Sequence, residues 1–200
     1  MKKYELTEDT KTLADGTVLH RIRALRDFTL VDGTKVREGD LGGWVERDDN
    51  LSQDGEAWVY GSARVCGSAC VSGSAWVCGS ARVCGSAWVS GDAWVCGSAR
   101  VCGEAWVYGE ACVCGDAYVC GSASVSDICD YAVYKNTWSS GRWFTYTRSN
   151  RMWKVGCFHG TGEELIAKAY KDSELSGRCY EAIVRAQEAV DRAIEKKRMK

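Results

Sequence analysis

Tryptophan and arginine recur at a constant spacing in the middle of this 200-residue sequence, and both residue types can bind ligands or partners. The three series are Trp58, Trp76 and Trp94; Trp88 and Trp106; and Arg64, Arg82 and Arg100. If a fold aligns each series, neighbouring guanidinium groups repel one another unless an anion lies over them, so phosphate or carboxylate is a candidate ligand. The alternative is that the arginines splay into water. Aligned exposed indoles favour an interface, and stacking within one chain is the alternative.

Cysteine is the third abundant residue that could do chemistry. Nine of the twelve cysteines lie between Cys66 and Cys120. Cys96, Cys112 and Cys114 could approach one another, but tetrahedral zinc needs four converging ligands. We therefore expect free thiols at compact corners and no structural metal.

A cysteine and a histidine also lie close together near the C-terminus. Cys157 and His159 alternate along "GCFHGTG" and could form a thiolate–imidazole pair. No third group that would orient the histidine is evident. We expect Cys157 to pack beneath helices and His159 to close a hairpin, so no catalytic residue and no cofactor are predicted.

A six-residue repeat must position the tryptophans and arginines. The unit G-[SDE]-A-x-V-x runs from Gly55 to Ser126 with twelve alanines and twelve valines and no insertion. Along a strand, Ala and Val of A-x-V face one side and the middle residue faces the other. Gly permits a positive φ at a corner. Such units cannot bury their own apolar face, so they must stack into a parallel β-helix.

This segment resembles the hexapeptide-repeat family. The pattern that carries the resemblance is an aliphatic residue followed four positions later by a small one, as in Val65 and Ala69. The resemblance implies a left-handed parallel β-helix with three units in each turn of eighteen residues, hence about four turns, and commonly a trimer. The variable residues repeat with the same period, which indicates columns on the outside of the coil. Family acyltransferases use a histidine on the coil as general base, whereas both histidines of this chain, His20 and His159, lie in the flanks.

The flanking segments predict a mainly β fold with a cap at one end and a small α+β region at the other. Hairpins are expected around Asp15-Gly16, Asp32-Gly33 and Ser149-Asn150. Two helices should follow, the first starting with a capping box of Thr161 and Glu164. The second should bury Tyr180, Ile183, Val184, Val190 and Ile194 on one face. The predicted regions are 1–54 (cap), 55–126 (coil) and 127–200 (hairpin and helices).

Cap, coil and tail together are similar to small hexapeptide-repeat proteins of bacterial prophages and phages. The residues that carry this similarity are "GDLGGWVE", "NLSQDGEAWVYG" and "TRSNRMWKVGCFHGTGEELI". Such proteins are often labelled transferases without demonstrated activity, so the similarity supplies no reaction. Because the coil lacks a histidine and carries Trp and Arg columns, we expect a non-enzymatic protein that binds a macromolecule or a copy of itself through these faces. The phage similarity implies a host protein, including a defence component, as a candidate partner.

Composition limits the remaining possibilities. The formal net charge is -1, which provides no global field for nucleic acid or an anionic membrane. No apolar run has the length of a signal peptide or membrane span, so a cytoplasmic protein is expected. Two alternatives to macromolecular binding stay open: a small-ligand binder for a nucleotide or sugar at an oligomer interface, and a hexapeptide acyltransferase-like enzyme.

Overall fold

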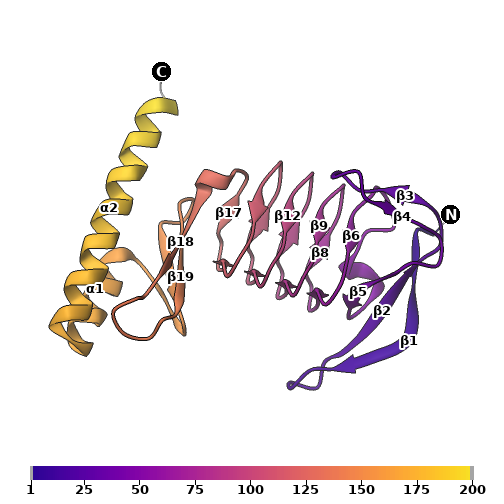
Figure 1. Cartoon of the computed structure of the whole chain (residues 1–200), viewed down its shortest axis with the longest axis horizontal. Helices are drawn as coiled ribbons and strands as arrows, with labels where there is room; N and C mark the ends of the chain where they lie inside the picture. The colour runs from indigo at the N-terminus through magenta and orange to yellow at the C-terminus, as the bar shows by residue number, and fades with distance from the viewer. Residues whose placement is uncertain (1, 199–200) are drawn as a thin grey trace. The chain divides into compact units, whose positions relative to one another are not determined.

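The computed structural model describes residues 2–198 and divides the chain into two compact units, Met1–Asp130 and Tyr131–Lys200. The first unit contains a β-rich cap and a solenoid of stacked parallel strands, and the second contains a four-stranded sheet with two helices (Figure 1). The predicted fold class is therefore confirmed. The division at residues 54 and 126 and the left-handed sense of the coil stay predictions.

The N-terminal cap forms the expected hairpins. Strands β1 (Tyr4–Thr12) and β2 (Val18–Ala24) pair antiparallel around Asp15-Gly16, and β3 (Phe28–Thr29) and β4 (Lys35–Val36) pair around Asp32-Gly33. In both turns the glycine has a positive φ, and the aspartate two residues before Thr17 or Thr34 accepts that residue's N–H. Strand β5 (Leu41–Val45) and the 3-10 turn η1 (Asp48–Asn50) then lead into the coil.

The coil is a set of two-residue strands that fall into three parallel sheets. One contains β7 (Arg64–Val65), β10 (Arg82–Val83), β13 (Arg100–Val101) and β16 (Tyr118–Val119). The second contains β8 (Cys70–Val71), β11 (Trp88–Val89), β14 (Trp106–Val107) and β17 (Ser124–Val125). The third contains β6 (Trp58–Val59), β9 (Trp76–Val77), β12 (Trp94–Val95) and β15 (Cys112–Val113). Every predicted column is thus confirmed by the strand register.

The repeat sequence explains this geometry. Every alanine and valine of the repeat is at most 1% exposed, so these small side chains fill the interior. Each unit turns at a glycine whose φ lies between 66° and 72°, a conformation that other residues adopt only with strain. Glycines of successive turns also stack closely, because a Cβ on Gly85 would lie 2.9 Å from the nitrogen of Gly103.

The solenoid begins earlier than the sequence repeat, which corrects the predicted four turns to about five. Strand β5 pairs parallel with β7, with Trp44 opposite Arg64, and Leu51 forms a parallel bridge with Val71. These pairs are separated by 20 residues, whereas Trp58 and Trp76 are separated by 18. Two extra residues between Leu51 and Trp58 interrupt the sequence period without interrupting the coil. Parallel pairing with the coil therefore begins at β5, before the sequence repeat.

Side chains complete the hydrogen bonds at the first turn of the solenoid. Within the coil, glycine and alanine carbonyls accept N–H bonds from the preceding turn, as Gly79 and Ala81 do. Lys3, which is fully buried, donates its ammonium to the carbonyls of Gly55 and Ala57, at 3.4 and 2.8 Å. On the next sheet of the coil, the side-chain amide of Asn50 donates in the same way to the carbonyls of Gly67 and Ala69.

The last turn has the opposite requirement, because its outward N–H groups have no following turn. The carboxylate of Asp130, in the 3-10 turn η2 (Ile128–Asp130), accepts from the backbone nitrogens of Ser126 and Asp127 at 2.9 and 3.1 Å. Side-chain donors at one end and a side-chain acceptor at the other thus pair backbone groups that have no neighbouring turn.

The second unit contains an antiparallel sheet and two helices. Its elements are β18 (Tyr131–Lys135), β19 (Trp143–Thr147), β20 (Met152–Val155), β21 (Phe158–Gly160), α1 (Gly162–Asp172) and α2 (Glu174–Arg198). The predicted hairpin at Ser149-Asn150 and the capping box of Thr161 and Glu164 are both confirmed. The core joins Phe144, Tyr146 and Trp153 of the sheet to Leu165 and Val184 of the helices, among others.

The predicted buried face of the second helix is wrong at one residue. Val190 is 48% exposed, and the buried positions around it are Gln187 and Asp191. These two polar side chains face the sheet because hydroxyl and guanidinium groups there satisfy them. Among residues 2–198, no helix combines the length and apolar character needed to cross a bilayer.

Candidate functional site

The first tryptophan series does not form one exposed ladder. Trp58 is fully buried, because Tyr4 and Phe28 of the cap pack edge-on against it at ring distances of 6.3 and 5.2 Å. Trp76 and Trp94 stack face to face, with centroids 5.0 Å apart and planes 13° apart. Of the three, Trp94 is the most exposed, at 39%. Trp58 is therefore a residue of the cap core and is removed from the predicted binding surface.

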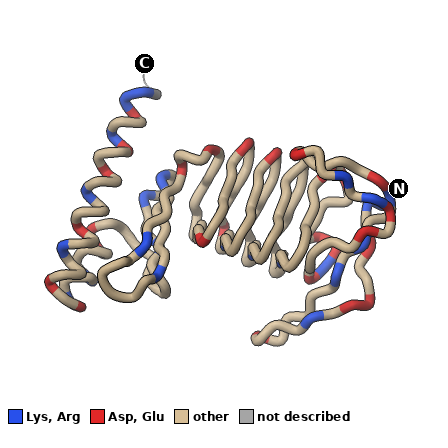
Figure 2. The backbone as a smooth tube through the Cα atoms, in the orientation of Figure 1, with Lys and Arg blue, Asp and Glu red and all other residues tan. Residues whose placement is uncertain are grey.

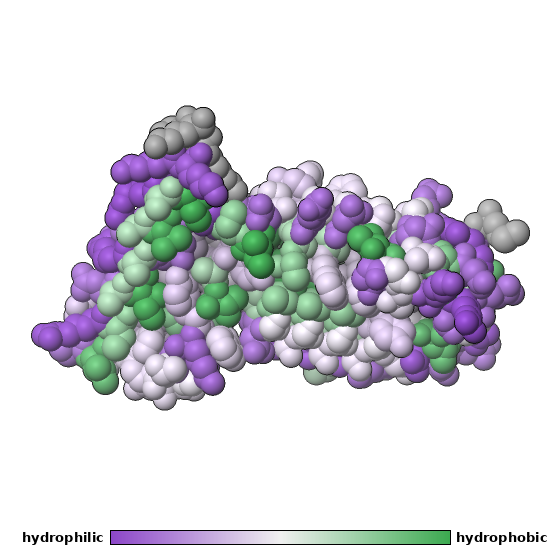
Figure 3. Space-filling model, turned by 45° about the horizontal axis from the view of Figure 1, so that its top comes forward, coloured by the Kyte–Doolittle hydropathy of each residue, from purple (hydrophilic) through white to green (hydrophobic). Residues whose placement is uncertain are grey.

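The second tryptophan series is the more open one. Trp88 and Trp106 are 46% and 53% exposed and meet edge to face at 5.8 Å. Ser72 and Ser90 lie beside them and line a shallow cleft with the two indoles. On the face drawn in the space-filling view, the solenoid carries only scattered strongly hydrophilic residues (Figure 3). These two tryptophans are the exposed aromatic pair on the second sheet of the coil, and Tyr60, Trp94 and Tyr108 are also exposed on the coil.

The indole N–H groups follow a rule set by the coil. Trp88 donates to Ser72 Oγ at 3.2 Å and Trp94 donates to Cys78 Sγ at 3.4 Å, in both cases sixteen residues earlier in the chain. The equivalent residue for Trp76 is Tyr60, whose oxygen lies at the far end of its ring, and the buried Nε1 of Trp76 has no partner. In these three cases the residue sixteen positions earlier thus decides whether the indole donor is paired.

The arginine series extends further than the repeat indicated. Directly opposed residues on adjacent strands are Arg21, Trp44, Arg64, Arg82, Arg100 and Tyr118. We call this set the arginine row. The guanidinium carbons of Arg21 and Arg100 lie over the rings of Trp44 and Tyr118, at 5.7 and 5.8 Å. The sequence did contain a signal for Trp44, because Trp44-Val45 has the x-V pattern of the repeat, but its offset of 20 residues concealed it.

The thiols form rows of their own. Hydrogen bonds to Cys102 and Cys66 raise the pKa of Cys84, and the bond with Cys84 lowers the pKa of Cys66. In the neighbouring row, burial raises the pKa of Cys96 to about 12. The twelve cysteines all lie within the described residues, and none of them forms a disulfide bond. Within residues 2–198, no three histidine, cysteine or acidic side chains converge in a geometry that would hold a metal ion.

Cys157 and His159 are both exposed, which corrects the expectation that Cys157 packs beneath the helices. Cys157 lies in the tight turn between β20 and β21, and His159 pairs with Lys154 across the two strands. The turn places the thiol at the surface because Gly156 takes a positive φ there. His159 lies within strand β21, and residues 156 and 157 form the turn, so the prediction that His159 closes a hairpin is also wrong.

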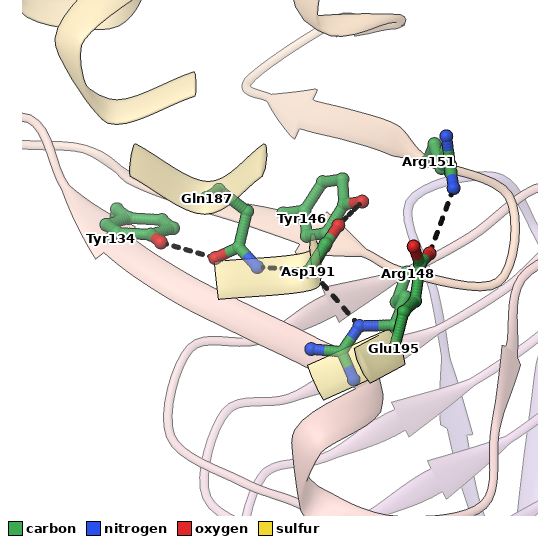
Figure 4. Close-up of polar contacts among 7 residues, drawn as sticks. All are labelled: Tyr134, Tyr146, Arg148, Arg151, Gln187, Asp191 and Glu195. Carbon is green, nitrogen blue, oxygen red and sulfur yellow. Dashed lines mark hydrogen bonds and ion pairs between the residues drawn. The ribbon is translucent and has the colours of Figure 1, made fainter. Parts of the chain in front are cut away.

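A buried polar network in the second unit had no counterpart in the sequence analysis (Figure 4). Asp191 accepts hydrogen bonds from the Tyr146 hydroxyl, from Arg148 Nε at 3.1 Å and from Gln187 Nε2 at 2.8 Å. The Tyr134 hydroxyl donates to Gln187 at 2.5 Å. Burial, together with the bond to Asp191, raises the pKa of Tyr146. Because donors already surround the carboxylate, this network joins helix α2 to the sheet rather than offering a free reactive group.

Comparison with known proteins gives limited information. No family model matches the chain. A stretch of 67 residues is 36% identical to "Uncharacterized acetyltransferase YdcK" of Escherichia coli (strain K12), over 30% of this chain and 19% of that protein. The chain thus spans about a fifth of the length of this relative. The protein is a β-solenoid with partial similarity to one named as an acetyltransferase.

Proposed function

We propose that this protein is a binding solenoid that assembles through its outward tryptophans, first of all with another copy of itself. One observation carries the proposal: Trp88 and Trp106 are about half exposed although the Ala/Val interior beneath them is already complete. Indole side chains that stay exposed to water contribute little to the stability of the monomer. They contribute most to the free energy of binding when a partner buries them, and tryptophan is enriched among the residues that dominate this energy at interfaces.

The architecture suits this role. Stacked two-residue strands present side chains from successive turns in fixed register, so Trp88 and Trp106 project from adjacent strands of one sheet. Little conformational entropy is lost when such a surface is buried, because the strands already hold the backbone. A host protein, including a defence component, is the alternative occupant of the same surface.

The test is the double variant Trp88→Ser, Trp106→Ser, studied by sedimentation over a range of concentrations. We expect the fold to survive, because both side chains point away from the core. Self-association should weaken by at least about thirtyfold, since one buried interface tryptophan typically contributes about 2 kcal/mol or more.

The matched control is Trp143→Ser, which removes a tryptophan of similar exposure, 45%, from strand β19 of the second unit. It should leave association unchanged. A wild-type chain that stays monomeric at high concentration and has no host partner sensitive to the Trp88/Trp106 change would refute the proposal.

Acetyl transfer is the second candidate, and the similarity to a named acetyltransferase favours it. In such a reaction an amine or hydroxyl attacks a thioester carbonyl, a thiol leaves, and a base takes the nucleophile's proton. Both histidines lie outside residues 55–126, and His20 Nδ1 lies 3.3 Å from the carbonyl of Thr7. A different base would therefore be needed on the coil.

Incubation with isotope-labelled acetyl-coenzyme A and a panel of small amines, followed by mass spectrometry, tests this candidate. Catalytic turnover would support acetyl transfer. Stoichiometric labelling of the chain's own thiols, or no labelling, would count against it.

A further inference from the structure

The arginine row concentrates the positive charge of the coil on one sheet. Arg64, Arg82 and Arg100 are the only basic residues between positions 55 and 126, and they occupy directly opposed positions on three adjacent strands. The backbone tube shows how sparse charge is elsewhere on the coil (Figure 2). Such segregation is not needed for folding, because the outward position tolerates Trp, Cys, Tyr and Ser on other turns.

Acidic residues of the coil are mostly kept away from this row. The corner residues that precede the three arginines are Ser62, Ser80 and Ser98, and the column becomes acidic only at Asp116, beyond the last arginine. The third sheet carries Glu56, Asp92 and Glu110 at the same corner. Glu46 is held by the N–H of Gly67 at 2.6 Å. Among residues 2–198, no carboxylate oxygen lies within 4.0 Å of these three guanidinium groups.

The spacing of the row fixes what kind of anion fits it. Strands of a parallel sheet are separated by about 4.8 Å, so Arg64 and Arg100 lie about 10 Å apart at the backbone. Like charges on adjacent strands destabilise a sheet unless a counter-charge bridges them. A ligand with several negative groups in a short line satisfies this condition, and guanidinium binds phosphate oxygens through paired N–H donors.

Aromatic residues of the row, Trp44 and Tyr118, flank the three arginines of the coil on either side. Arg21 lies over Trp44 and donates Nε to the carbonyl of Gly42 at 3.2 Å, while Arg100 lies over Tyr118. These contacts hold the outer guanidinium groups against the sheet. Arg82, which is exposed, has an arginine on each side.

We infer that the arginine row binds a chain of linked phosphate groups, such as a short polyphosphate or the triphosphate of a nucleotide. This assignment rests on the proposed function only in taking the solenoid as a binding surface. It uses a different sheet from Trp88 and Trp106, so loss of self-association would leave it standing. Ligand binding bridges Arg64, Arg82 and Arg100 and removes their mutual repulsion.

Calorimetric titration of the full chain with inorganic tripolyphosphate is the primary test, with ATP and inorganic phosphate as parallel ligands. Tripolyphosphate should bind and orthophosphate should bind at least tenfold more weakly, because a single phosphate reaches fewer arginines. Affinity should fall as salt is raised. Comparable affinity for ATP identifies the phosphate chain as the recognised group, and much tighter ATP binding identifies a nucleotide as its source.

The decisive variant is Arg82→Gln, with Arg37→Gln, an exposed arginine of the cap outside the row, as the matched control. Arg82→Gln should reduce tripolyphosphate affinity by about tenfold or more, consistent with loss of a charge-assisted contact. Its melting temperature without ligand should stay equal or rise, because the central like charge is gone, which separates lost binding from misfolding. The control should keep wild-type affinity.

Three results would overturn the inference. They are no binding of tripolyphosphate or ATP, equal weakening by Arg37→Gln and Arg82→Gln, and binding of a single-stranded oligonucleotide without binding of either phosphate chain.

Discussion

Lys3 is a fully buried lysine that hydrogen-bonds the first turn of the solenoid. Its aliphatic stem passes through the cap and its nitrogen reaches carbonyls that have no preceding turn. Burial lowers the pKa of Lys3 from 10.5 to about 8, with Glu56 opposing that change. The ammonium group thus loses part of its hydration, and it pairs the buried carbonyls of Gly55 and Ala57 instead.

Replacing Lys3 by methionine should destabilise the first unit by about 1–3 kcal/mol, because buried carbonyls are left without a donor. Lys2→Met is the matched control, since Lys2 is exposed and adjacent, and it should have little effect. Urea unfolding measured by circular dichroism gives both values. Equal stability of the two variants would contradict this role for Lys3.

The same residue predicts a pH dependence. The folded chain releases the Lys3 proton near pH 8 and the unfolded chain near 10.5, so the cost of the buried charge is complete below pH 8. That cost is relieved as pH rises from 8 to 10.5. The stability of the wild type relative to Lys3→Met should therefore increase across this window, and a constant difference would show that Lys3 titrates normally in the fold.

At the scale of secondary-structure elements, the constant length of the repeat unit keeps the strands of successive turns in register. Each two-residue strand buries its valine and directs the neighbouring residue to the outside of the coil, where only Trp58 is covered by the cap. A shift of one residue therefore exchanges the two faces. Pairing continues without a slip from β6 to β15 and from β7 to β16.

One residue inserted after Gly91 should disrupt every turn that follows it and cost at least about 4 kcal/mol, beyond the usual range of single changes. Inserting a copy of residues 91–108 adds a complete turn, preserves every column and should leave the melting temperature almost unchanged. Circular dichroism and thermal melting compare the two insertions. Indifference to the single insertion would show that the columns do not determine folding.

Helix α2 depends on a different kind of contact. Asp191 and Arg148 are 9% and 13% exposed at the side chain, whereas the Arg151–Glu195 pair nearby is largely exposed. Asp191→Ala should cost about 3 kcal/mol, because it leaves a largely buried guanidinium and a buried phenol without their acceptor. Glu195→Ala should cost at most about 1 kcal/mol. Circular dichroism of the helical signal during urea unfolding, which follows α1 and α2 of the second unit, measures both.

At the scale of the whole molecule, two cores share no residue. Alanine and valine fill the solenoid, and aromatic and aliphatic side chains fill the second unit. The Asp130 cap lies at the end of the first unit. Each unit therefore contains the contacts that stabilise it.

A fragment of residues 1–130 should fold and keep the solenoid's thermal transition, while a fragment of residues 1–126 should melt lower because it lacks the Asp130 acceptor. Calorimetry of the full chain and both fragments tests this. An unfolded 1–130 fragment would show that the solenoid requires the second unit.

The sequence by itself determined the solenoid and its outward columns. Its period is carried by local requirements, with a glycine at each corner and Ala and Val inside each strand, so every unit specifies the same geometry. The capping box at Thr161 and the three hairpins were predictable for the same reason, because each depends on a few adjacent residues.

Tertiary structure alone decided the features that join distant segments. Trp58 belongs to an outward column by sequence, yet Tyr4 and Phe28 bury it. Trp44 joins the arginine row although two extra residues break the period that would have placed it there. Gln187 and Asp191, rather than Val190, lie on the buried face of α2, because the hydroxyl of Tyr134 and the guanidinium of Arg148 donate hydrogen bonds to them. In each case the outcome depends on a partner more than twenty residues away or on an offset in pairing, and a local pattern contains neither.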